Sequence, residues 1–140
     1  MRVMVIVKSS KDCEAGKLPS EELLAAMGEY NKELMQAGVL VNLSGLQPTS
    51  KGARVKFSGG KTTVTDGPFA ETKELIGGYW IIDVKSKAEA IEWAKRVPVQ
   101  CGEEERQIEV RQFYEFTDFL PGKTIQEARE LEKQLVESRR

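Results

Sequence analysis

Hydrophobic residues occur in short runs that polar turns separate, and each run predicts one element of secondary structure. Residues 2–8 are rich in Val and Ile and give way to a polar stretch at 9–16, which is typical of a buried strand. Between Pro19 and Gly38 the apolar side chains recur at helical spacing, and Ser20 is placed to cap the first turn. The chain is therefore expected to begin with a strand followed by a helix.

The middle of the chain predicts a strand, a hairpin and another strand. Residues 39–46 have strand character and end before Pro48, which cannot donate a hydrogen bond to a β-ladder. Apolar and polar residues alternate over residues 53–65 around Gly59-Gly60, which predicts a β-hairpin with one solvated face. Residues 78–84 again have the composition of a strand.

Two helices and one strand complete the prediction. The sequence Ser86-Lys87-Ala88-Glu89 is a capping box, and the helix that it opens ends before Pro98. Residues 107–114 are rich in β-branched and aromatic side chains and predict the last strand. Residues 124–127 form a second capping box, which predicts a helix near the C-terminus.

This order of elements predicts an α+β fold. Strand, helix, strand, hairpin, strand, helix and strand describe a ferredoxin-like sandwich, in which two βαβ units surround a β-hairpin. A chain of 140 residues has the usual size of one domain with one core. We expect that core within residues 1–115, with a C-terminal helical extension over residues 116–140.

The first predicted strand is apolar on both of its faces. Val3, Val5 and Val7 point to one side, and Met4 and Ile6 point to the other. In a ferredoxin-like fold the helices cover only one face of the sheet, so a second apolar face needs another partner. We therefore predict a homodimer in which two sheets face each other. The alternative is that the C-terminal helix folds back over this face.

Charge and hydropathy exclude two classes of partner. The chain has 21 Lys and Arg against 22 Asp and Glu, so it has no net field that would attract nucleic acid or an anionic membrane. Its longest apolar run, residues 3–7, is far shorter than the roughly 20 residues that span a bilayer. Lys8 ends that run, and the N-terminus lacks the pattern of a secretory signal. We expect a cytoplasmic protein that binds neither nucleic acid nor membranes.

The sequence offers few groups for metal or nucleophilic chemistry. Cys13 and Cys101 belong to no CxxC or CxxH pattern, and we expect free thiols, with a disulfide between them as the alternative. There is no histidine, so neither an imidazole base nor a histidine-ligated metal is available. No phosphate-binding loop or nucleophile elbow is recognised. We predict neither a cofactor nor a metal.

One segment carries a family resemblance. Residues 65–74, with the sequence TDGPFAETKE, and the Gly77-Gly78-Tyr79 that follows are similar to the signature of the DGPF branch of the YCII-related family. We call residues 65–74 the DGPF segment. The resemblance extends over about residues 1–115. Three further segments match the family pattern, at residues 38–40, 45–48 and 81–84.

The resemblance implies more about architecture than about chemistry. It implies a ferredoxin-like subunit that dimerises into an α/β barrel, with a cavity at the sheet interface. It implies no defined reaction, because the His and Asp pair suggested for the wider family lacks its histidine here. DGPF proteins are often encoded beside extracytoplasmic-function sigma factors, so the resemblance also implies a functional link to such a factor.

Asp66 is the candidate catalytic residue in the DGPF segment. Beside a cation in a cavity, its carboxylate would act as a general base or anchor a ligand amine or hydroxyl. The alternative is a structural turn, in which Asp66 forms an Asx hydrogen bond, Gly67 permits the backbone conformation and Pro68 fixes the exit. The residue types are consistent with both interpretations.

Four other residues are candidate ligand-binding groups. Lys73 or Arg54 would hold a substrate anion, whereas the ordinary role of each is that of a solvated surface charge. Glu71 would add a second acidic group beside Asp66, and Tyr79 would line the pocket unless it belongs to the core. The acids of the DGPF segment lack the spaced loop of a calcium site, so no metal site is predicted here.

These observations support two functional hypotheses. The first is a dimeric small-molecule-binding or regulatory accessory protein with a pocket near Asp66. The second is a cofactor-independent enzyme, a lyase or isomerase acting on a small organic acid, with Asp66 as its acid or base. A third interpretation is that the DGPF segment only locks the dimer. The sequence does not decide whether the protein is an enzyme.

Overall fold

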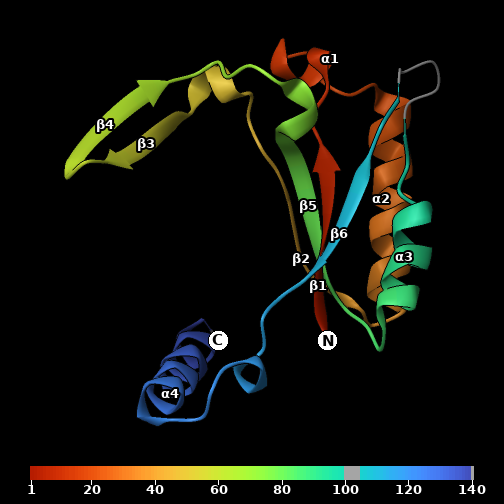
Figure 1. Cartoon of the computed structure of the whole chain (residues 1–140). Coiled ribbons are helices and arrows are strands. Elements are labelled where there is room, and N and C mark those ends of the chain that lie inside the picture. The colour runs from red at the N-terminus through yellow and green to blue at the C-terminus, as the bar shows by residue number, and fades with distance from the viewer. Residues whose placement is uncertain (100–104, 140) are drawn as a thin grey trace.

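The computed structural model describes residues 1–99 and 105–139, in which helices and strands follow one another much as the sequence predicts (Figure 1). The first half contains β1 (Arg2–Lys8), α1 (Lys11–Glu14), α2 (Glu21–Gln36), β2 (Leu40–Gly45), β3 (Ala53–Ser58) and β4 (Lys61–Asp66). The second half contains β5 (Ile76–Asp83), α3 (Lys87–Lys95), β6 (Ile108–Gln112) and α4 (Lys123–Ser138). Short 3₁₀ turns lie between them: η1 (Thr49–Lys51), η2 (Thr72–Glu74) and η3 (Phe116–Asp118).

Four of the strands form one antiparallel sheet in the order β2-β5-β1-β6. Strand β1 pairs with both β5 and β6, and β2 pairs with β5. The units β1-α2-β2 and β5-α3-β6 therefore each place a strand of the other unit between their own two strands. This topology is compatible with a ferredoxin-like fold, and it confirms the predicted α+β class.

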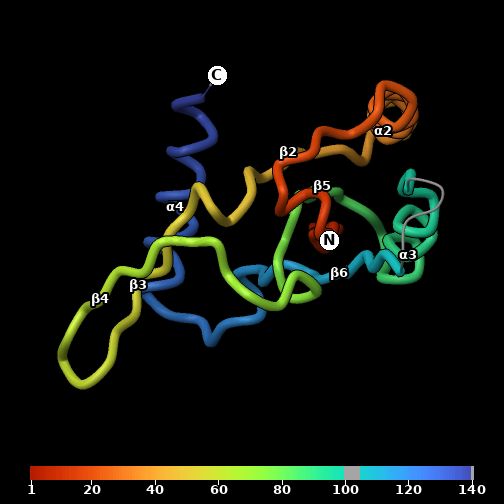
Figure 2. Tube along the Cα trace, turned by 90° about the horizontal axis from the view of Figure 1, so that it is seen from above, coloured from red at the N-terminus to blue at the C-terminus, as the bar shows by residue number. Residues whose placement is uncertain are grey.

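Helices α2 and α3 cover one face of this sheet (Figures 1 and 2). The core beneath them contains Val3 and Val5 of β1, Leu34 of α2 and Ile82 of β5, none of which is more than 1% exposed. Successive residues of a strand point to opposite faces, so the odd-numbered valines of β1 meet the helices. Burial of these apolar side chains is the main force that holds the helices against the sheet.

Three aromatic side chains join the helices to the sheet. Tyr30 of α2 meets Trp80 of β5 edge to face, with ring centroids 5.2 Å apart. Its hydroxyl donates a 2.9 Å hydrogen bond to the carbonyl oxygen of Trp93 in α3, so the polar end of the ring has a partner. Burial raises the pKa of Tyr30 to about 12. Tyr30 is therefore a neutral hydrogen-bond donor at physiological pH.

The opposite face of the sheet, which we call the open face, carries Met4, Ile6, Tyr79 and Ile81. Strand pairing places Met4 beside Ile81 and Ile6 beside Tyr79. The predicted apolar character of β1 on both sides is thus confirmed. Helix α4 stands to one side of the sheet (Figures 1 and 2), so the C-terminal helix does not fold back over the open face.

The hairpin β3–β4 forms a second sheet that projects away from the first (Figure 1). Its turn residues Gly59 and Gly60 have φ of 57° and 76°, left-handed values that glycine adopts readily. The sequence pattern predicted one solvated face, but every residue of both strands is exposed. The alternation therefore marks an apolar face that this subunit leaves uncovered.

Two details differ from the sequence prediction. The polar stretch 9–16 contains the one-turn helix α1, in which the Ser10 side chain accepts a 3.2 Å hydrogen bond from the Cys13 amide. A single polar turn has no apolar periodicity, so the hydrophobic pattern missed it. The capping box expected at residues 124–127 is wrong, because α4 begins at Lys123 after Gly122 and has no side-chain cap.

Helices α2 and α4 are the longest described, with 16 residues each. Within the described parts of the chain, no helix has the length and apolar character needed to cross a bilayer.

Candidate functional site

A cavity of about 860 Å³ is lined by α1 and the segment after it, by α2, and by the ends of β2 and β5. Its apolar lining includes Leu23 and Met27 of α2, Leu43 of β2 and Trp80 of β5. Small-molecule sites in proteins usually have volumes of about 300–1,000 Å³ and mostly apolar walls. The cavity therefore has the size and the wall chemistry of a ligand site.

Asn31 gives this cavity a polar group in a fixed orientation. Its Oδ1 atom accepts a 2.7 Å hydrogen bond from Trp80 Nε1. An indole nitrogen can only donate, so this bond identifies which atom of the carboxamide is the oxygen. The Nδ2 group makes no hydrogen bond to any residue in the described part of the chain. Asn31 therefore presents two N–H donors in the cavity wall.

Charged side chains of both signs also line the cavity. Asp12 and Lys17 form an ion pair with 3.8 Å between Oδ2 and Nζ. Lys51 and Arg106 contribute further positive charge, and Glu14 contributes a carboxylate. The positively charged groups and the Asn31 amide together suit a ligand that carries hydrogen-bond acceptors or a negative charge.

Glu14 connects the cavity wall to the DGPF segment through Thr49. Its two carboxylate oxygens accept hydrogen bonds from the Thr49 amide at 3.2 Å and the Thr49 hydroxyl at 2.5 Å. The same hydroxyl oxygen accepts a 3.0 Å bond from the Phe69 amide. These bonds link α1, η1 and the DGPF segment, which are far apart in the sequence.

Gly67 lies against the backbone of η1. Its amide donates a 3.0 Å hydrogen bond to the Gly52 carbonyl oxygen. A Cβ atom added at Gly67 would stand 1.7 Å from the Thr49 carbonyl oxygen, far closer than atoms can approach. Gly67 is therefore needed for the close packing of two backbone segments, and the Gly67–Pro68 peptide bond is cis.

Arg54 and Phe69 hold the base of the hairpin to the same segment. The guanidinium carbon of Arg54 lies 3.9 Å from the centroid of the Phe69 ring, which is the geometry of a cation–π contact. Arg54, one of the candidate ligand-binding residues, thus contacts the DGPF segment from outside it. Its planar group is occupied by an aromatic face of the protein itself.

Asp66 lies at the end of β4, where it pairs with Ala53 in the ladder. Its side chain is exposed, and within the described residues it forms neither a hydrogen bond nor an ion pair. The Asx hydrogen bond of the turn interpretation is therefore not formed, because Asp66 still belongs to the strand. The packing of Gly67 shapes the turn instead.

The remaining predicted site residues do not converge on Asp66. Lys73 lies in η2 and is exposed, and Glu71 is exposed just before it with φ of 66°. Tyr79 borders the cavity, which Asp66, Lys73, Glu71 and Arg54 do not line. In residues 1–99 and 105–139, no three His, Cys, Asp or Glu side chains are grouped so as to hold a metal ion. Cys13 is a free thiol at the cavity, and Cys101 lies outside the described residues.

The pair Gly77-Gly78 shapes the strand that borders the cavity. The register of β1 and β5 shifts opposite Gly77, which is an irregularity of the β-bulge type. A Cβ atom on Gly78 would lie 3.0 Å from the Ser44 carbonyl oxygen of the neighbouring strand. Gly78 therefore allows close packing of two backbone segments, and Gly77 lies at the irregularity of the ladder.

Sequence reasoning missed the residues that give the cavity its polar character. Asn31 and Trp80 are 49 positions apart, and Glu14 and Thr49 are 35 positions apart. The available signal was a tryptophan in a buried strand, since a buried indole N–H usually requires an acceptor. Nothing in the local sequence identifies Asn31 as that acceptor.

Comparison with known proteins places the chain in a family. The profile of the YCII-related domain matches residues 1–117. An uncharacterized protein of Rhizobium meliloti (strain 1021) is 37% identical over 79 residues, which are 56% of this chain and 64% of that protein. The aligned part thus spans less than two thirds of that relative. Because the family match covers most of the sequence and the full sheet, the chain belongs to the YCII-related family.

Proposed function

We propose that the protein is a homodimeric small-molecule-binding protein of the DGPF branch of its family, with its ligand site in the cavity beside Asn31 and Trp80. The observation that carries this proposal is the fixed Asn31 carboxamide in the wall of a cavity of about 860 Å³. The pocket predicted near Asp66 is replaced in this proposal by a cavity that Glu14, Thr49 and Phe69 connect to the DGPF segment.

The wall chemistry favours a small carboxylate with an apolar body. Leu23, Met27 and Leu43 would contact the apolar part of such a ligand. The Asn31 amide would donate to its carboxylate, and Lys51 is a lining cation that forms no ion pair with the described residues. The enzyme hypothesis drawn from the sequence named the same class, a small organic acid, as its substrate, whereas the binding hypothesis named no ligand class.

The arrangement supports binding better than proton transfer. Among residues 1–99 and 105–139, two carboxylates line the cavity, and each already has a partner: Asp12 pairs with Lys17, and Glu14 accepts both hydrogen bonds from Thr49. Asp66, the proposed acid or base of the enzyme hypothesis, is exposed and outside the cavity wall. General acid–base catalysis requires the group to reach the reacting proton.

An Asn31→Asp variant tests the ligand site. The aspartate keeps an oxygen acceptor for Trp80, but it removes the two N–H donors and adds a negative charge. Benzoate, phenylacetate and indole-3-acetate serve as probes, with dissociation constants measured by NMR titration. Loss of a charge-assisted hydrogen bond is expected to weaken binding by about tenfold or more.

The matched control is Asn42→Asp, which makes the same chemical change on β2 outside the cavity. Asn42 is exposed, and its Oδ1 atom accepts only from the neighbouring Leu43 amide. Unchanged probe binding is expected for this variant. Equal weakening by both variants, or binding by neither the variants nor the wild type, would contradict a carboxylate site at Asn31.

The homodimer is supported by the open face, where no helix covers the half-buried side chains of Met4, Tyr79 and Ile81 (Figure 1). Ile6 on the same face is already buried. Light scattering in solution tests this part of the proposal. A mass twice the 15.7 kDa of one chain is expected, and a mass of one chain at micromolar concentration would overturn it. Two further elements of the proposal, the DGPF branch and a functional link to an extracytoplasmic-function sigma factor, rest on the family resemblance.

A further inference from the structure

The subunit has far more surface than a compact protein of its size. Its accessible surface is 10668 Å², whereas a compact monomer of 15.7 kDa has roughly 7,300 Å². The excess is roughly 3,400 Å². A stable dimer interface buries roughly 2,000–5,000 Å² in total, so two such subunits carry enough spare surface to form one.

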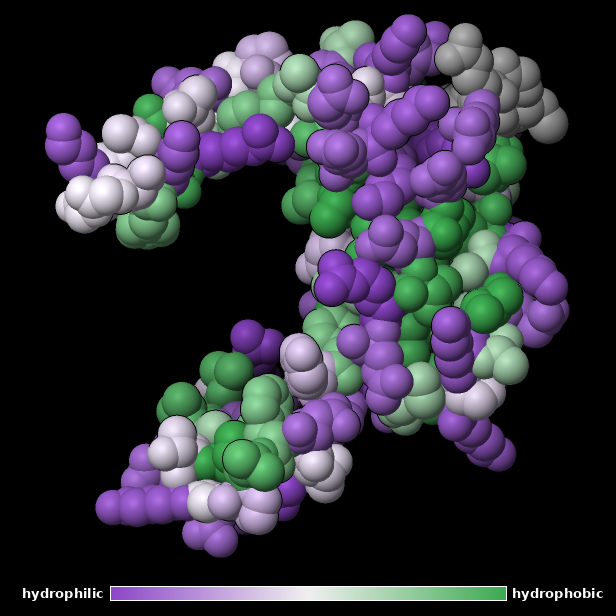
Figure 3. Space-filling model, in the orientation of Figure 1, coloured by the Kyte–Doolittle hydropathy of each residue, from purple (hydrophilic) through white to green (hydrophobic). Residues whose placement is uncertain are grey.

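Two segments, which we call arms, project from the sheet. One is the hairpin β3–β4, and the other is the C-terminal arm, which we define as residues 114–138. Both project on the side of the open face and leave a hollow between them (Figures 1 and 3). Figure 3 shows hydrophobic side chains on both arms around that hollow.

The hairpin carries an uncovered apolar face. Val55 pairs with Val64 and Phe57 pairs with Thr62, so these side chains share one face of the two-stranded sheet. The exposed fractions of Val55, Val64 and Phe57 are 53%, 67% and 80%. An isolated two-stranded hairpin is marginally stable in water, so this face is expected to be covered in the assembled protein.

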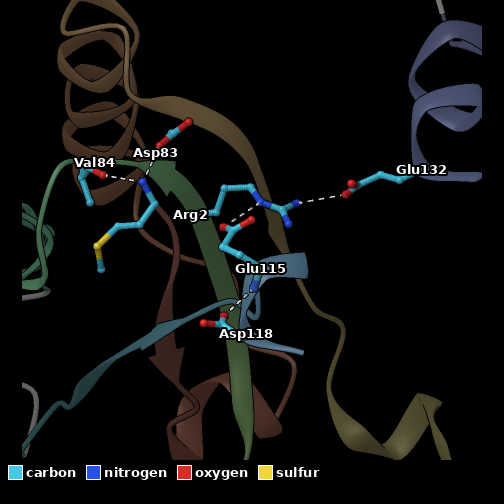
Figure 4. A network of polar contacts seen from close by, with 7 residues as sticks. Arg2, Asp83, Val84, Glu115, Asp118 and Glu132 are labelled. Atoms are coloured by element: carbon cyan, nitrogen blue, oxygen red, sulfur yellow. Dashed lines mark hydrogen bonds and ion pairs between the residues drawn. The ribbon is translucent and has the colours of Figure 1, made fainter. Parts of the chain in front are cut away.

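Helix α4 carries a matching stripe on the other arm. Leu131 and Leu135 lie one turn apart and are 67% and 50% exposed. Arg2 of β1 joins the arm to the sheet through two ion pairs (Figure 4). Its Nε atom lies 3.6 Å from Oε1 of Glu115, and its Nη1 atom lies 3.7 Å from Oε1 of Glu132. Exposed ion pairs of this kind contribute little stability, and a lone helix of this length is marginal in water. The helix therefore also needs an apolar partner.

The two arms have opposite charge. The hairpin β3–β4, residues 53–66, carries three cations and one carboxylate, a net charge of +2. Residues 115–138, which precede the two terminal arginines, carry six carboxylates and three cations, a net charge of −3. Contact between hairpin and C-terminal arm is therefore favoured, whereas contact between two hairpins would bring like charges together.

We propose that in the homodimer each α4 packs Leu131 and Leu135 against the apolar hairpin face of the partner subunit. This inference rests on the proposed homodimer and specifies how its subunits meet. The two arms of one subunit stand at opposite ends of its sheet (Figure 1). A twofold axis across the strands exchanges these ends, so the partner's hairpin meets α4 and the contact occurs twice. The two open faces are then enclosed between the two pairs of arms.

Disulfide trapping tests this arrangement in a full-length chain that carries Cys13→Ser and Cys101→Ser. Four double variants combine Val55→Cys or Val64→Cys with Leu131→Cys or Leu135→Cys. After mild oxidation, at least one double variant is expected to migrate as a covalent dimer on a non-reducing gel, because contacting positions bring Cα atoms within about 7 Å. The four single variants are expected to remain monomeric on the gel.

Control variants and solution masses separate the possible failures. Thr63→Cys lies on the opposite face of the hairpin and should form no covalent dimer with either leucine position. A covalent dimer formed by a variant with only a hairpin cysteine would overturn the proposed contact between α4 and the partner's hairpin. The same holds if intact-mass measurement shows that the double variants form disulfides only within one chain. Absence of any cross-link in a protein that light scattering shows to be dimeric also overturns it, but leaves the homodimer standing. A monomeric mass overturns both.

Discussion

The indole Nε1 atom of Trp80 donates a 2.7 Å hydrogen bond to Oδ1 of Asn31, and this bond joins the central sheet to helix α2. Trp80 is only 4% exposed, so its N–H group has no ready access to water. The pair therefore contributes to stability as well as to the polarity of the cavity.

Removing the acceptor from this pair is expected to destabilise the protein. Asn31→Leu leaves the buried indole N–H without a partner, which should lower the free energy of unfolding by about 1–3 kcal/mol. Asn31→Asp keeps an oxygen at the same place and should lose less. Urea denaturation followed by tryptophan fluorescence measures both changes. Equal stability of Asn31→Leu and the wild type would show that the bond contributes nothing.

Gly67→Ala is expected to be among the most harmful small substitutions in the chain. The new Cβ atom would lie 1.7 Å from the Thr49 carbonyl oxygen, so one of two backbone segments must move. We expect the free energy of unfolding to fall by about 2 kcal/mol or more.

Gly28→Ala in α2 is the matched control for this substitution. Apart from its chain neighbours and the backbone of its own helix, no atom lies within 4 Å of the Cβ position at Gly28, and alanine is favoured over glycine in a helix by about 0.8–1 kcal/mol. Gly28→Ala should therefore stabilise the protein in the same urea experiment. Similar losses in the two variants would show that close packing at Gly67 is not the cause.

Tyr30 should contribute to unfolding at alkaline pH. Its pKa is about 12 in the folded protein because burial disfavours the charged phenolate, whereas the ordinary value is 10.0. Below pH 10 the phenol is neutral in both the folded and the unfolded state, so the stabilising contribution of buried Tyr30 is fully present. As pH rises from 10 to about 12, the unfolded chain loses the proton first, so stability falls. Tyr30→Phe should be about 1 kcal/mol less stable at pH 7 but should show a smaller decline over that range, as urea titrations at each pH will reveal.

Asp66→Asn addresses the catalytic hypothesis directly. The carboxylate is exposed and lacks a partner among the described residues, so we expect the free energy of unfolding to change by no more than about 0.5 kcal/mol. Binding of the carboxylate probes should also be unchanged, because Asp66 does not line the cavity. If probe affinity or any measured turnover depends on Asp66, the ligand site must extend to the DGPF segment.

The sequence predicted the elements better than it predicted the site, and the reason is the range of the interactions. β1 follows from a run of Val and Ile, and α2 follows from a cap at Ser20 that binds the Leu23 amide. The cavity instead depends on pairs such as Glu14 with Thr49, which meet only after the sheet has formed. Asp66 was singled out because its neighbours are unusual in sequence, yet the packing of Gly67 accounts for much of that pattern.

The exposed arms give the final prediction. Val64→Asp places a carboxylate on the apolar hairpin face, where the proposed contact with the partner's α4 would remove it from water. We expect the dissociation constant of the dimer to rise about tenfold or more, measured by sedimentation velocity over a dilution series. Thr63→Asp changes the hairpin charge by the same amount on the opposite face, so its dimer should dissociate much as the wild type does. Equal weakening by both variants would mean that hairpin charge, and not the face formed by Val55, Val64 and Phe57, controls association.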